Sequence, residues 1–592
     1  MVKATPAKLS FLQARVSAGL WLRSVPPVIF LIWVLLSNSA KAQITQGTGS
    51  QADSPASVQG RVLNRVTHEP ISRALVYSPD QRYAMLTDDR GRFEFKISQP
   101  ATQAKDGLTA TTDNRPPSGR QIEMLLNLGP QQLFARKPGF LDSSNDPTPG
   151  LVTPNQSEIV IYLDPEALIV GHVSLPGSEG DMRINVNLYR RQIREGEGHW
   201  ESVRTARTWA DGEFRFSELA AGTYKLGTSE ELDRDPLAST PGGQLYGFPP
   251  IFYPGASDMS TASAIALATG ATFQANLSPV RREYYPIRIP VVNGGDERGL
   301  GLQIYPVGHP GPGYSLGFNS AEQMIQGSLP EGNFTLQATT RGQGGSTGFL
   351  NFSVRGGPYV GPGVNLIPNT SLSVTVREEF KSGASVFGED IPASDDRQPN
   401  GAPQRRVNVQ VLLTSVEAFG SQGTAVSQPV SGTQEHTLLL QDVAPGRYRV
   451  RVQSGVGYAA SIVYGGTDLS RQPLVVGLGG SSAPIEVTLR DDGAEVDGKV
   501  EEGTPCCVYF LPVGEGSGQF REVGSTPDGA FGVNQLPPGT YRVLAFDRQQ
   551  EDFAYNDVEA MRKLESKGEV IHVEAGQKEH LRLKVIPGGE PQ

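Results

Sequence analysis

The sequence predicts an all-β protein, organised as tandem β-sandwich domains. One observation is a repeat: "WADGEFRFSELAAGTYKLGT" (209–228) returns in the same register as "TPDGAFGVNQLPPGTYRVLAFD" (526–547). A second is composition, because 69 glycines and 45 prolines are dispersed among short stretches of alternating apolar residues, which is typical of many turns between short strands. A third is length: 592 residues exceed one core and predict four or five domains at roughly 150 residues each.

The repeated stretch has a physical interpretation. Asp-Gly favours a tight turn, because glycine accepts the positive φ that such turns need. The F-x-F pattern then sends two apolar side chains to one face of a strand. A Leu and a Pro-Gly or Ala-Gly step reverse the chain, and Y-x-L/V starts the next strand. The stretch is therefore predicted to be a β-hairpin that each domain repeats.

Further copies of the stretch are incomplete. "GSLPEGNFTL" (327–336) and "TLLLQDVAPGRYRV" (437–450) keep the apolar, Gly and aromatic positions, and "TDDRGRFEFKI" (87–97) keeps the first half. Copies spaced by about one hundred residues indicate one hairpin per sandwich. The predicted domains are 57–166, 167–280, 281–368 (a divergent copy), 369–492 and 493–592, preceded by a linker over 43–56.

The N-terminus has the features of a secretory signal peptide over residues 1–42. Basic residues precede the nine-residue apolar core "VIFLIWVLL" (28–36), and Ala40-Lys41-Ala42 forms an A-x-A cleavage site. A membrane-spanning helix needs about 20 apolar residues, so cleavage is preferred over an uncleaved anchor. We therefore expect a secreted or periplasmic protein with no transmembrane segment in the mature chain.

Charge argues against nucleic acid as a partner. Residues 1–42 contain five of the 52 basic residues and none of the 62 acidic ones, so cleavage changes the formal charge from −10 to −15. No basic stripe is left to neutralise phosphates. The two cysteines, Cys506 and Cys507, are adjacent, and their Cα atoms are about 3.8 Å apart, which is too close for an unstrained mutual disulfide. One is expected in the core and the other exposed or under a loop.

The first predicted domain resembles a known family. "VQGRVLNRVTHEPISRALVY" (58–77), the T-D-x-x-G-x-F-x-F stretch, "ARKPGF" (135–140) and the strand "SEIVIYLDP" (157–165) resemble the carboxypeptidase regulatory-like domain. That family has a transthyretin-like, or prealbumin-like, β-sandwich. Three later stretches resemble secreted Acidobacteria proteins built from such domains: "FYPGASDMSTASAIALATGATFQANLSPV" (252–280), "GYAASIVYGGTDLS" (457–470) and "GEVIHVEAGQ" (568–577). The resemblance implies transthyretin-like or immunoglobulin-like sandwiches, with a polar loop inserted over 98–130.

Motifs for catalysis are missing from the sequence. Zinc carboxypeptidases use an H-x-x-E pair and a distant His, but no histidine here has Glu three residues later. Neither G-x-S-x-G nor a phosphate-binding glycine loop is present. We therefore predict that the protein is not an enzyme and has no cofactor. The acidic loops "SEELDRDP" (229–236) and "GEDIPASDDRQ" (388–398) offer several oxygen ligands of the kind that calcium favours, although neither has a known calcium-binding spacing.

The predicted ligand-binding surface is "QLYGFPPIFYPG" (244–255). Tyr246, Phe248, Phe252 and Tyr253 stand among Pro and Gly, which could display the rings for stacking on sugars or packing on a protein. The alternative is that these rings close the open end of the second sandwich. In the last domain, "NDVEAMRKLESKG" (556–568) predicts a helix that begins after Asn556, ends at Gly568 and covers one edge of the sandwich.

Two functions remain open from the sequence. The first is a non-catalytic binding or scaffolding protein of the cell envelope, whose partner is a polysaccharide or a protein. The second is an accessory subunit that docks to an outer-membrane transporter or a secreted hydrolase. The sequence identifies neither the ligand nor the oligomeric state.

Overall fold

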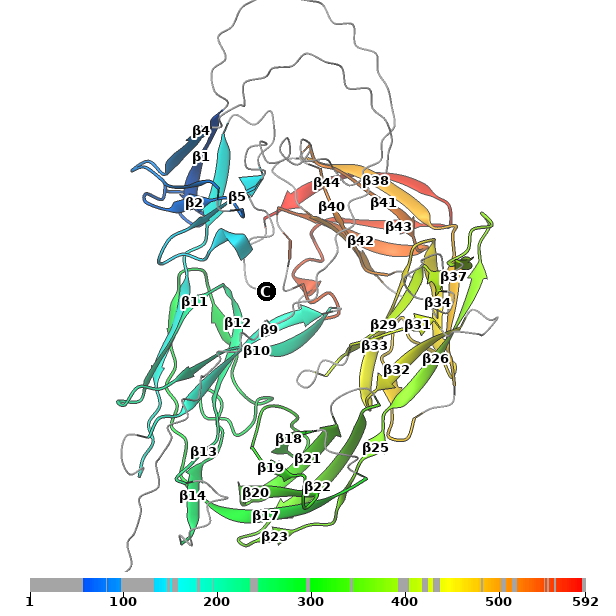
Figure 1. The fold of residues 1–592 in the computed structure, drawn as a ribbon. Coiled ribbons are helices and arrows are strands. Elements are labelled where there is room, and N and C mark those ends of the chain that lie inside the picture. The colour runs from blue at the N-terminus through cyan, green and yellow to red at the C-terminus, as the bar shows by residue number, and fades with distance from the viewer. Residues whose placement is uncertain are drawn as a thin grey trace, which may run out of the picture. The chain divides into compact units, whose positions relative to one another are not determined.

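The computed structural model describes residues 57–587, apart from 81, 97–131, 146–149, 152–157, 178–181, 195, 235–242, 294–298, 341–343, 392–403, 418–423, 430–436, 481–482, 502–506, 514–518, 527, 548, 551–552 and 558–560. The fold is all-β, as the sequence predicts: the described residues form strands β1 to β44 and one 3-10 helix, η1 (Figure 1). Within these ranges, no helix has the length and apolar character needed to cross a bilayer.

The strands form five β-sandwiches, numbered here 1 to 5 along the chain. Sandwich 1 consists of β1 (Ser57–Asn64), β2 (Leu75–Tyr77), β3 (Ala84–Leu86), β4 (Arg92–Lys96), β5 (Gln132–Arg136), η1 (Ser143–Asn145), β6 (Gly150–Leu151) and β7 (Ile159–Leu163). Sandwich 2 consists of β8 (Ala167–His172), β9 (Asn185–Arg194), β10 (Glu197–Arg207), β11 (Glu213–Leu219), β12 (Gly222–Thr228), β15 (Ile265–Leu267) and β16 (Thr272–Gln274).

Sandwich 3 includes two short strands that precede it in the chain, β13 (Glu231–Leu232) and β14 (Leu245–Phe248), because they pair onto its sheet. Its other strands are β17 (Arg282–Val292), β18 (Leu300–Pro306), β19 (Gly317–Asn319), β20 (Met324–Pro330), β21 (Gly332–Thr340), β22 (Ser346–Val354), β23 (Tyr359–Val360), β24 (Val364–Asn365) and β25 (Ile367–Pro368).

Sandwiches 4 and 5 complete the chain. Sandwich 4 consists of β26 (Thr370–Glu379), β27 (Phe387–Ile391), β28 (Gln404–Val407), β29 (Val409–Ser415), β30 (Thr424–Val426), β31 (Gln428–Pro429), β32 (Thr437–Val443), β33 (Gly446–Ser454), β34 (Tyr458–Tyr464), β35 (Thr467–Asp468), β36 (Leu474–Val476) and β37 (Ile485–Arg490). Sandwich 5 consists of β38 (Ala494–Glu501), β39 (Cys507–Pro512), β40 (Arg521–Gly524), β41 (Ala530–Leu536), β42 (Gly539–Phe546), β43 (Glu569–Val573) and β44 (Lys578–Ile586).

All five sandwiches share one strand arrangement. The first strand of each lies between an antiparallel strand from the middle of the unit and a parallel strand from its end. These trios are β4–β1–β7, β11–β8–β16, β20–β17–β23, β32–β26–β37 and β41–β38–β44. Each unit also has its own buried apolar cluster, in residues 62–163, 167–277, 287–366, 372–489 and 494–583.

The glycine turn of the repeat adopts the predicted conformation. Gly91, Gly212 and Gly529 have φ of 70°, 82° and 85°, a region that is costly for residues with a Cβ. Each glycine N–H donates to the carbonyl three residues earlier, at 2.8 to 3.1 Å. The carbonyl of each glycine accepts from a backbone amide of the first strand or the residue after it, at 2.8 to 2.9 Å. The turn is therefore tied to the strand that it faces.

The first phenylalanine of the F-x-F pattern lies on a glycine of the first strand. Phe93 pairs with Gly60, Phe214 with Gly171 and Phe531 with Gly498, each directly across an antiparallel pair. A Cβ on any of these glycines would lie 2.3 to 2.7 Å from the phenylalanine ring. Glycine in a strand often marks the close approach of another group, and here that group is the ring.

The repeated stretch is not a hairpin, which corrects the sequence-based prediction. Its first strand pairs with the first strand of the unit. Its second strand belongs to a different sheet in three units, as the pairs β11 and β12, β20 and β21, and β32 and β33 show; in sandwich 5, β41 and β42 belong to one curled sheet but are not neighbours, since β44 and β38 lie between them. Just before the crossing, Glu218, Asp442 and Gln535 have φ of 52°, 56° and 57°, and the pairing register shifts there. Such a bulge bends a strand out of its ladder, so the chain crosses the core instead of reversing in one sheet.

The tyrosine of the repeat closes this crossing. The hydroxyls of Tyr224, Tyr448 and Tyr541 donate to the carbonyl four residues earlier, at 2.7, 2.8 and 2.7 Å. This contact has the form of the tyrosine corner found in immunoglobulin-like sandwiches. Phe334 takes the same place in sandwich 3 and is buried without a hydroxyl.

In the described part of 556–568, where the sequence predicts a helix, turn residues outnumber helical ones. Met561 and Arg562 are helical, turns follow, and 558–560 lie outside the described residues. Met561 and Leu564 pack on the apolar cluster around Tyr509, as the predicted apolar face required, and Gly568 has φ of 72°. Cys507 is buried in this cluster. Cys506, the signal peptide, the linker and the 98–130 insert fall outside the described ranges.

Replacing the strand glycine should destabilise sandwich 5. In Gly498→Ala, the new Cβ would lie 2.3 Å from the Leu581 carbonyl oxygen and 2.7 Å from the Phe531 ring. Overpacking of this kind costs about 1–3 kcal/mol. Hydrogen exchange over residues 494–586 should report faster opening. Gly532→Ala on the adjacent strand is the control, because its Cβ would meet nothing closer than 4.0 Å. Equal protection in the two variants would contradict the packing argument.

Removing the hydroxyl of the tyrosine corner should destabilise its sandwich less than the glycine substitution destabilises sandwich 5. Tyr448→Phe leaves the Ala444 carbonyl without its 2.8 Å hydrogen bond and should cost about 1 kcal/mol in the local stability of sandwich 4. Hydrogen exchange over 370–490 measures this cost. Tyr464→Phe is the matched control, since no hydrogen bond of its hydroxyl is found within the described part of the chain. A cost at position 464 as large as at 448 would contradict the corner's role.

Candidate functional site

The predicted aromatic surface is largely part of the fold. Residues 245–248 form β14, which pairs with β17 of sandwich 3. Phe248 and Phe252 are 0% and 1% exposed, so neither ring can stack on a ligand, and the prediction that all four rings are displayed is wrong. Phe252 packs with Tyr189 and Met259 in a small apolar cluster.

The other two rings of this stretch are half-buried. The Tyr246 hydroxyl donates to Glu283 at 3.2 Å, and the Arg281 guanidinium lies 4.6 Å from the ring centroid. Tyr253 packs edge-on against Phe273, with ring centroids 5.8 Å apart, and contacts the core of sandwich 2. The alternative interpretation, in which the stretch closes the end of the second sandwich, fits Tyr253, whereas residues 245–248 pack on sandwich 3.

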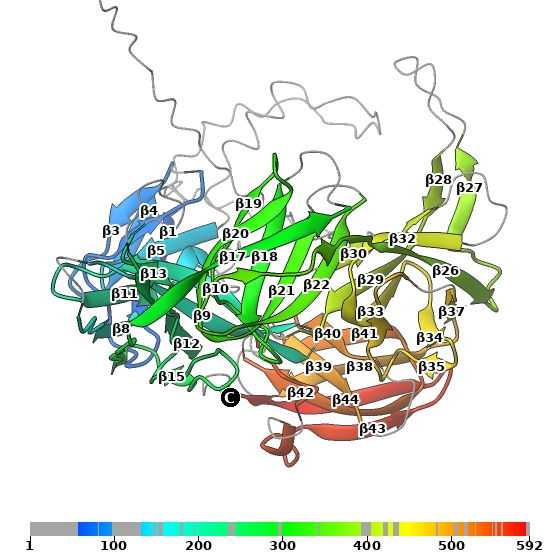
Figure 2. The ribbon, with the colours of Figure 1, turned by 90° about the horizontal axis from the view of Figure 1, so that it is seen from below.

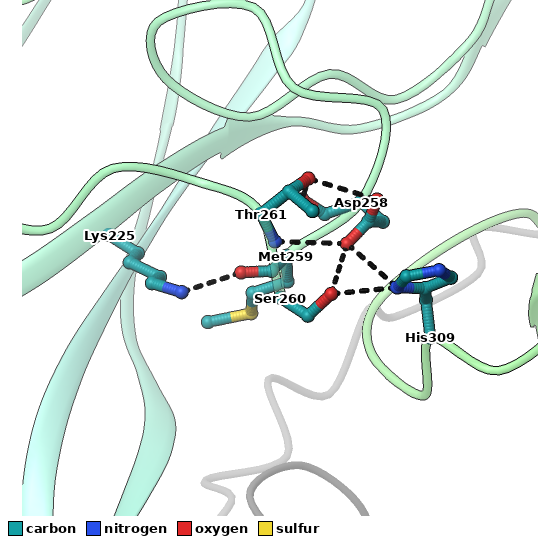
Figure 3. A network of polar contacts seen from close by, with 6 residues as sticks. All are labelled: Lys225, Asp258, Met259, Ser260, Thr261 and His309. Atoms are coloured by element: carbon teal, nitrogen blue, oxygen red, sulfur yellow. Dashed lines mark hydrogen bonds and ion pairs between the residues drawn. The ribbon is translucent and has the colours of Figure 1, made fainter.

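A polar network lies beside this stretch (Figure 3). Asp258 is 7% exposed and accepts hydrogen bonds from the Ser260 hydroxyl and from the Thr261 hydroxyl and backbone N–H, the last two at 3.0 Å. His309, from the loop after β18, places Nδ1 2.8 Å from Ser260 Oγ and 3.4 Å from Asp258 Oδ1. Burial works to raise the pKa of Asp258, but the hydrogen bonds outweigh it and lower that pKa.

This Asp, Ser and His combination does not have the geometry of a catalytic triad. In a triad, one ring nitrogen of the histidine faces the serine and the other faces the carboxylate. Here the same nitrogen, Nδ1, faces both, and the Ser260 hydroxyl donates directly to Asp258. The hydroxyl therefore has no separate base. The network instead connects the 258–261 turn to the loop that carries His309.

Lys225 supports the same turn from the opposite side (Figure 3). Its side chain is buried, and Nζ donates to the Met259 carbonyl at 2.6 Å and lies 4.8 Å from the centroid of the Trp200 ring. Burial lowers the pKa of the ammonium group, and the nearby Asp258 carboxylate opposes this. A cation over an aromatic face gains electrostatic energy, so Trp200 has a structural partner here.

Glu230 is a buried carboxyl that sequence inspection did not single out. Its Oε2 accepts the Ser315 N–H at 3.0 Å, whereas Oε1 is buried without a hydrogen bond of normal geometry among the described residues. The Tyr284 hydroxyl lies next to this carboxyl and is also buried. Burial raises the pKa of Glu230 to about 7, although the Ser315 N–H opposes the shift. Burial also raises the pKa of Tyr284.

The acidic loops do not form a calcium site in the described part of the chain. In the first loop, Glu230 is buried, Glu231 begins β13 and Asp233 pairs with Arg281. Most of the second loop, 392–398, falls outside the described ranges. Among the residues that are described, no group of three or more His, Cys, Asp or Glu side chains could hold a metal ion.

Comparisons with known proteins give no family assignment. No family model matches the chain, and no curated protein matches it. The resemblance to the carboxypeptidase regulatory-like domain therefore stays a prediction. Among solved structures, the chain is similar to the TIE protein of Bacillus anthracis, at 9% identity over 74% of this chain and 75% of that one, with a TM-score of 0.14.

Two pilin structures are also similar. A streptococcal ancillary pilin is 9% identical over 55% of this chain and 99% of its own, with a TM-score of 0.18. The full-length major pilin RrgB of Streptococcus pneumoniae is 10% identical over 71% of this chain and 99% of its own, with a TM-score of 0.12. At these TM-scores the similarities carry no conclusion about function.

The buried Glu230 should make stability depend on pH. Its folded pKa of about 7 exceeds the ordinary value of 4.5, so the folded state binds the proton more tightly. The stability gained in this way is complete below pH 4.5 and is lost as pH rises towards 7. Glu230→Gln should therefore melt like the original at pH 4.5 but be more stable at pH 8, by about 3 kcal/mol at most.

Scanning calorimetry at the two pH values tests this expectation. Glu331→Gln is the control, because this exposed carboxyl near the same strands should show no such difference. A Glu230→Gln variant that is equally destabilised at both pH values would mean that the carboxylate itself is required.

Proposed function

We propose that this protein is a non-catalytic, exported, multi-domain binding or scaffolding protein of the cell envelope, with polysaccharide or protein partners. The observation that carries this proposal is the location of the residues that the repeated stretches share. The shared Gly, Phe and Tyr positions are buried inside the sandwiches and hold strands together. The residues that the units share therefore stabilise the fold and are not available to a partner, as expected of a scaffold. Binding would then depend on the outer faces, which differ between units.

The outer faces do differ between units. Across β38 and β44, sandwich 5 carries a row of charged and polar contacts. Lys578 pairs with Glu495 at 2.7 Å and Arg582 with Glu501 at 3.6 Å, and His580 Nδ1 lies 3.1 Å from Asp497. Across β18, β21 and β22, the outer face of sandwich 3 has amides and hydroxyls in place of charges. The predicted signal peptide supports a location in the periplasm or outside the cell.

Sedimentation with cell envelopes tests the proposal. The chain from Gln43, the form expected after cleavage, should sediment with isolated envelopes or with insoluble polysaccharide, and the heat-unfolded chain is the control. Binding that survives protease treatment of the envelopes would identify a polysaccharide partner. Binding lost after that treatment would identify a protein partner, such as an outer-membrane transporter or an associated hydrolase. A chain that stays in solution with both materials would refute the proposal.

A further inference from the structure

Sandwich 3 has an outer sheet face that differs in chemistry from the ion-paired face of sandwich 5. Strands β18, β21 and β22 run side by side (Figures 1 and 2), and alternate residues of each point away from the core. The outward rows are Gly301, Gln303, Tyr305 and Val307; Asn333, Thr335, Gln337 and Thr339; and Thr347, Phe349, Asn351 and Ser353. Tyr305, Thr335 and Thr347 of these rows are buried, whereas Asn333, Phe349 and Asn351 are exposed. None of the side chains in these rows carries a charge, in a chain where 19% of residues are charged.

Two asparagines on this face are held in place by neighbouring hydroxyls. Thr335 donates to Asn351 Oδ1 at 2.8 Å, and Ser353 donates to Asn333 Oδ1 at 2.6 Å. Each amide carbonyl oxygen is thus engaged, whereas neither amide nitrogen makes a hydrogen bond to another described residue. Both asparagines are exposed. The four N–H donors of these two exposed amides are therefore left for a ligand.

Apolar surface accompanies these donors. Phe349, on β22, is 39% exposed, and Val307, in the turn directly after β18, is 43% exposed. An open depression of about 570 Å³ adjoins the amides and is lined by Pro306, Val307, Asn333, Asn351, Phe352 and Ser353. This volume falls within the range of about 300–1,000 Å³ that is usual for small-molecule sites.

We propose that this outer face of β18, β21 and β22 binds an uncharged polysaccharide chain. The assignment rests on the proposed function and names the surface and the ligand class. Sugar hydroxyls accept hydrogen bonds from amide N–H groups, and the C–H faces of sugar rings pack on aromatic and aliphatic side chains. A charged polymer would find no opposite charge in these rows to compensate its desolvation. A protein partner would gain more from a face rich in aromatic and other large apolar side chains than from rows of amides and hydroxyls.

Affinity electrophoresis of the full chain tests this proposal. Native gels would contain a neutral glucan, mannan or galactan, with polygalacturonate as the charged counterpart. We expect at least one neutral polysaccharide to slow migration, and polygalacturonate to have no effect. The Asn333→Asp/Asn351→Asp double variant keeps the size of both side chains and the oxygens that accept from Ser353 and Thr335, but it removes the four N–H donors. It should bind at least tenfold more weakly.

The matched control is Gln410→Glu, which makes the same amide-to-carboxylate change at an exposed position on β29 of sandwich 4 and should leave binding unchanged. Phe349→Ala should also weaken binding, and hydrogen exchange across β21 and β22 checks that the sheet is intact. Undiminished binding by a folded double variant would overturn the proposal, as would no retardation by any neutral polymer. Continued sedimentation with envelopes in that last case would leave the scaffolding function standing, with a protein as the partner.

Discussion

A phenylalanine ring lying on a strand glycine is the contact on which each well-preserved sandwich depends. At Gly60, a Cβ would meet the Phe93 ring at 2.3 Å on one side and the Ile159 carbonyl oxygen at 2.4 Å on the other. Because glycine has no side chain, the antiparallel strand and the parallel strand can both approach the first strand closely at this position. Because three strands are positioned by one residue, the glycine sets the spacing of the sheet against the core. Sandwiches 2 and 5 use the same contact at Gly171 and Gly498.

The fold class could be predicted because the residues that make this packing contact recur in the repeated stretch. Alternating apolar residues, positive-φ glycines and the aromatic position are local features, and local features can be seen in a sequence. The hairpin was wrong for a physical reason. Alternating apolar residues indicate that one side of a strand faces the core. Strands of both sheets face the core, so the alternation does not show whether two consecutive strands belong to the same sheet. The crossing depends on a left-handed bulge at Glu218, Asp442 or Gln535, three residue types with no common preference for that conformation.

The candidate site was harder to predict because burial is decided by partners distant in the chain. The stretch 244–255 has the composition of a displayed aromatic loop. Its first part is instead a strand, because β17 begins about 35 residues later and offers an edge for pairing; Leu245 lies opposite Tyr284. Glu230 was overlooked for the same reason, since its partner Ser315 is 85 residues away. No local pattern distinguishes a buried carboxyl from the solvated acids beside it.

The amide-rich face of sandwich 3 shows how strand register creates a surface that the sequence does not display. Asn333 and Asn351 lie within apolar strands, and only the pairing of β21 with β22 brings their rows together. On the inner side, Phe334 lies opposite Phe352, with ring centroids 5.8 Å apart, and Phe352 packs on Tyr359 at 5.0 Å. A slip of one residue in β21 would expose Phe334 and bury Asn333. The aromatic pairs in the core therefore fix the register that turns the amides outward, so packing on one side of the sheet determines the chemistry on the other.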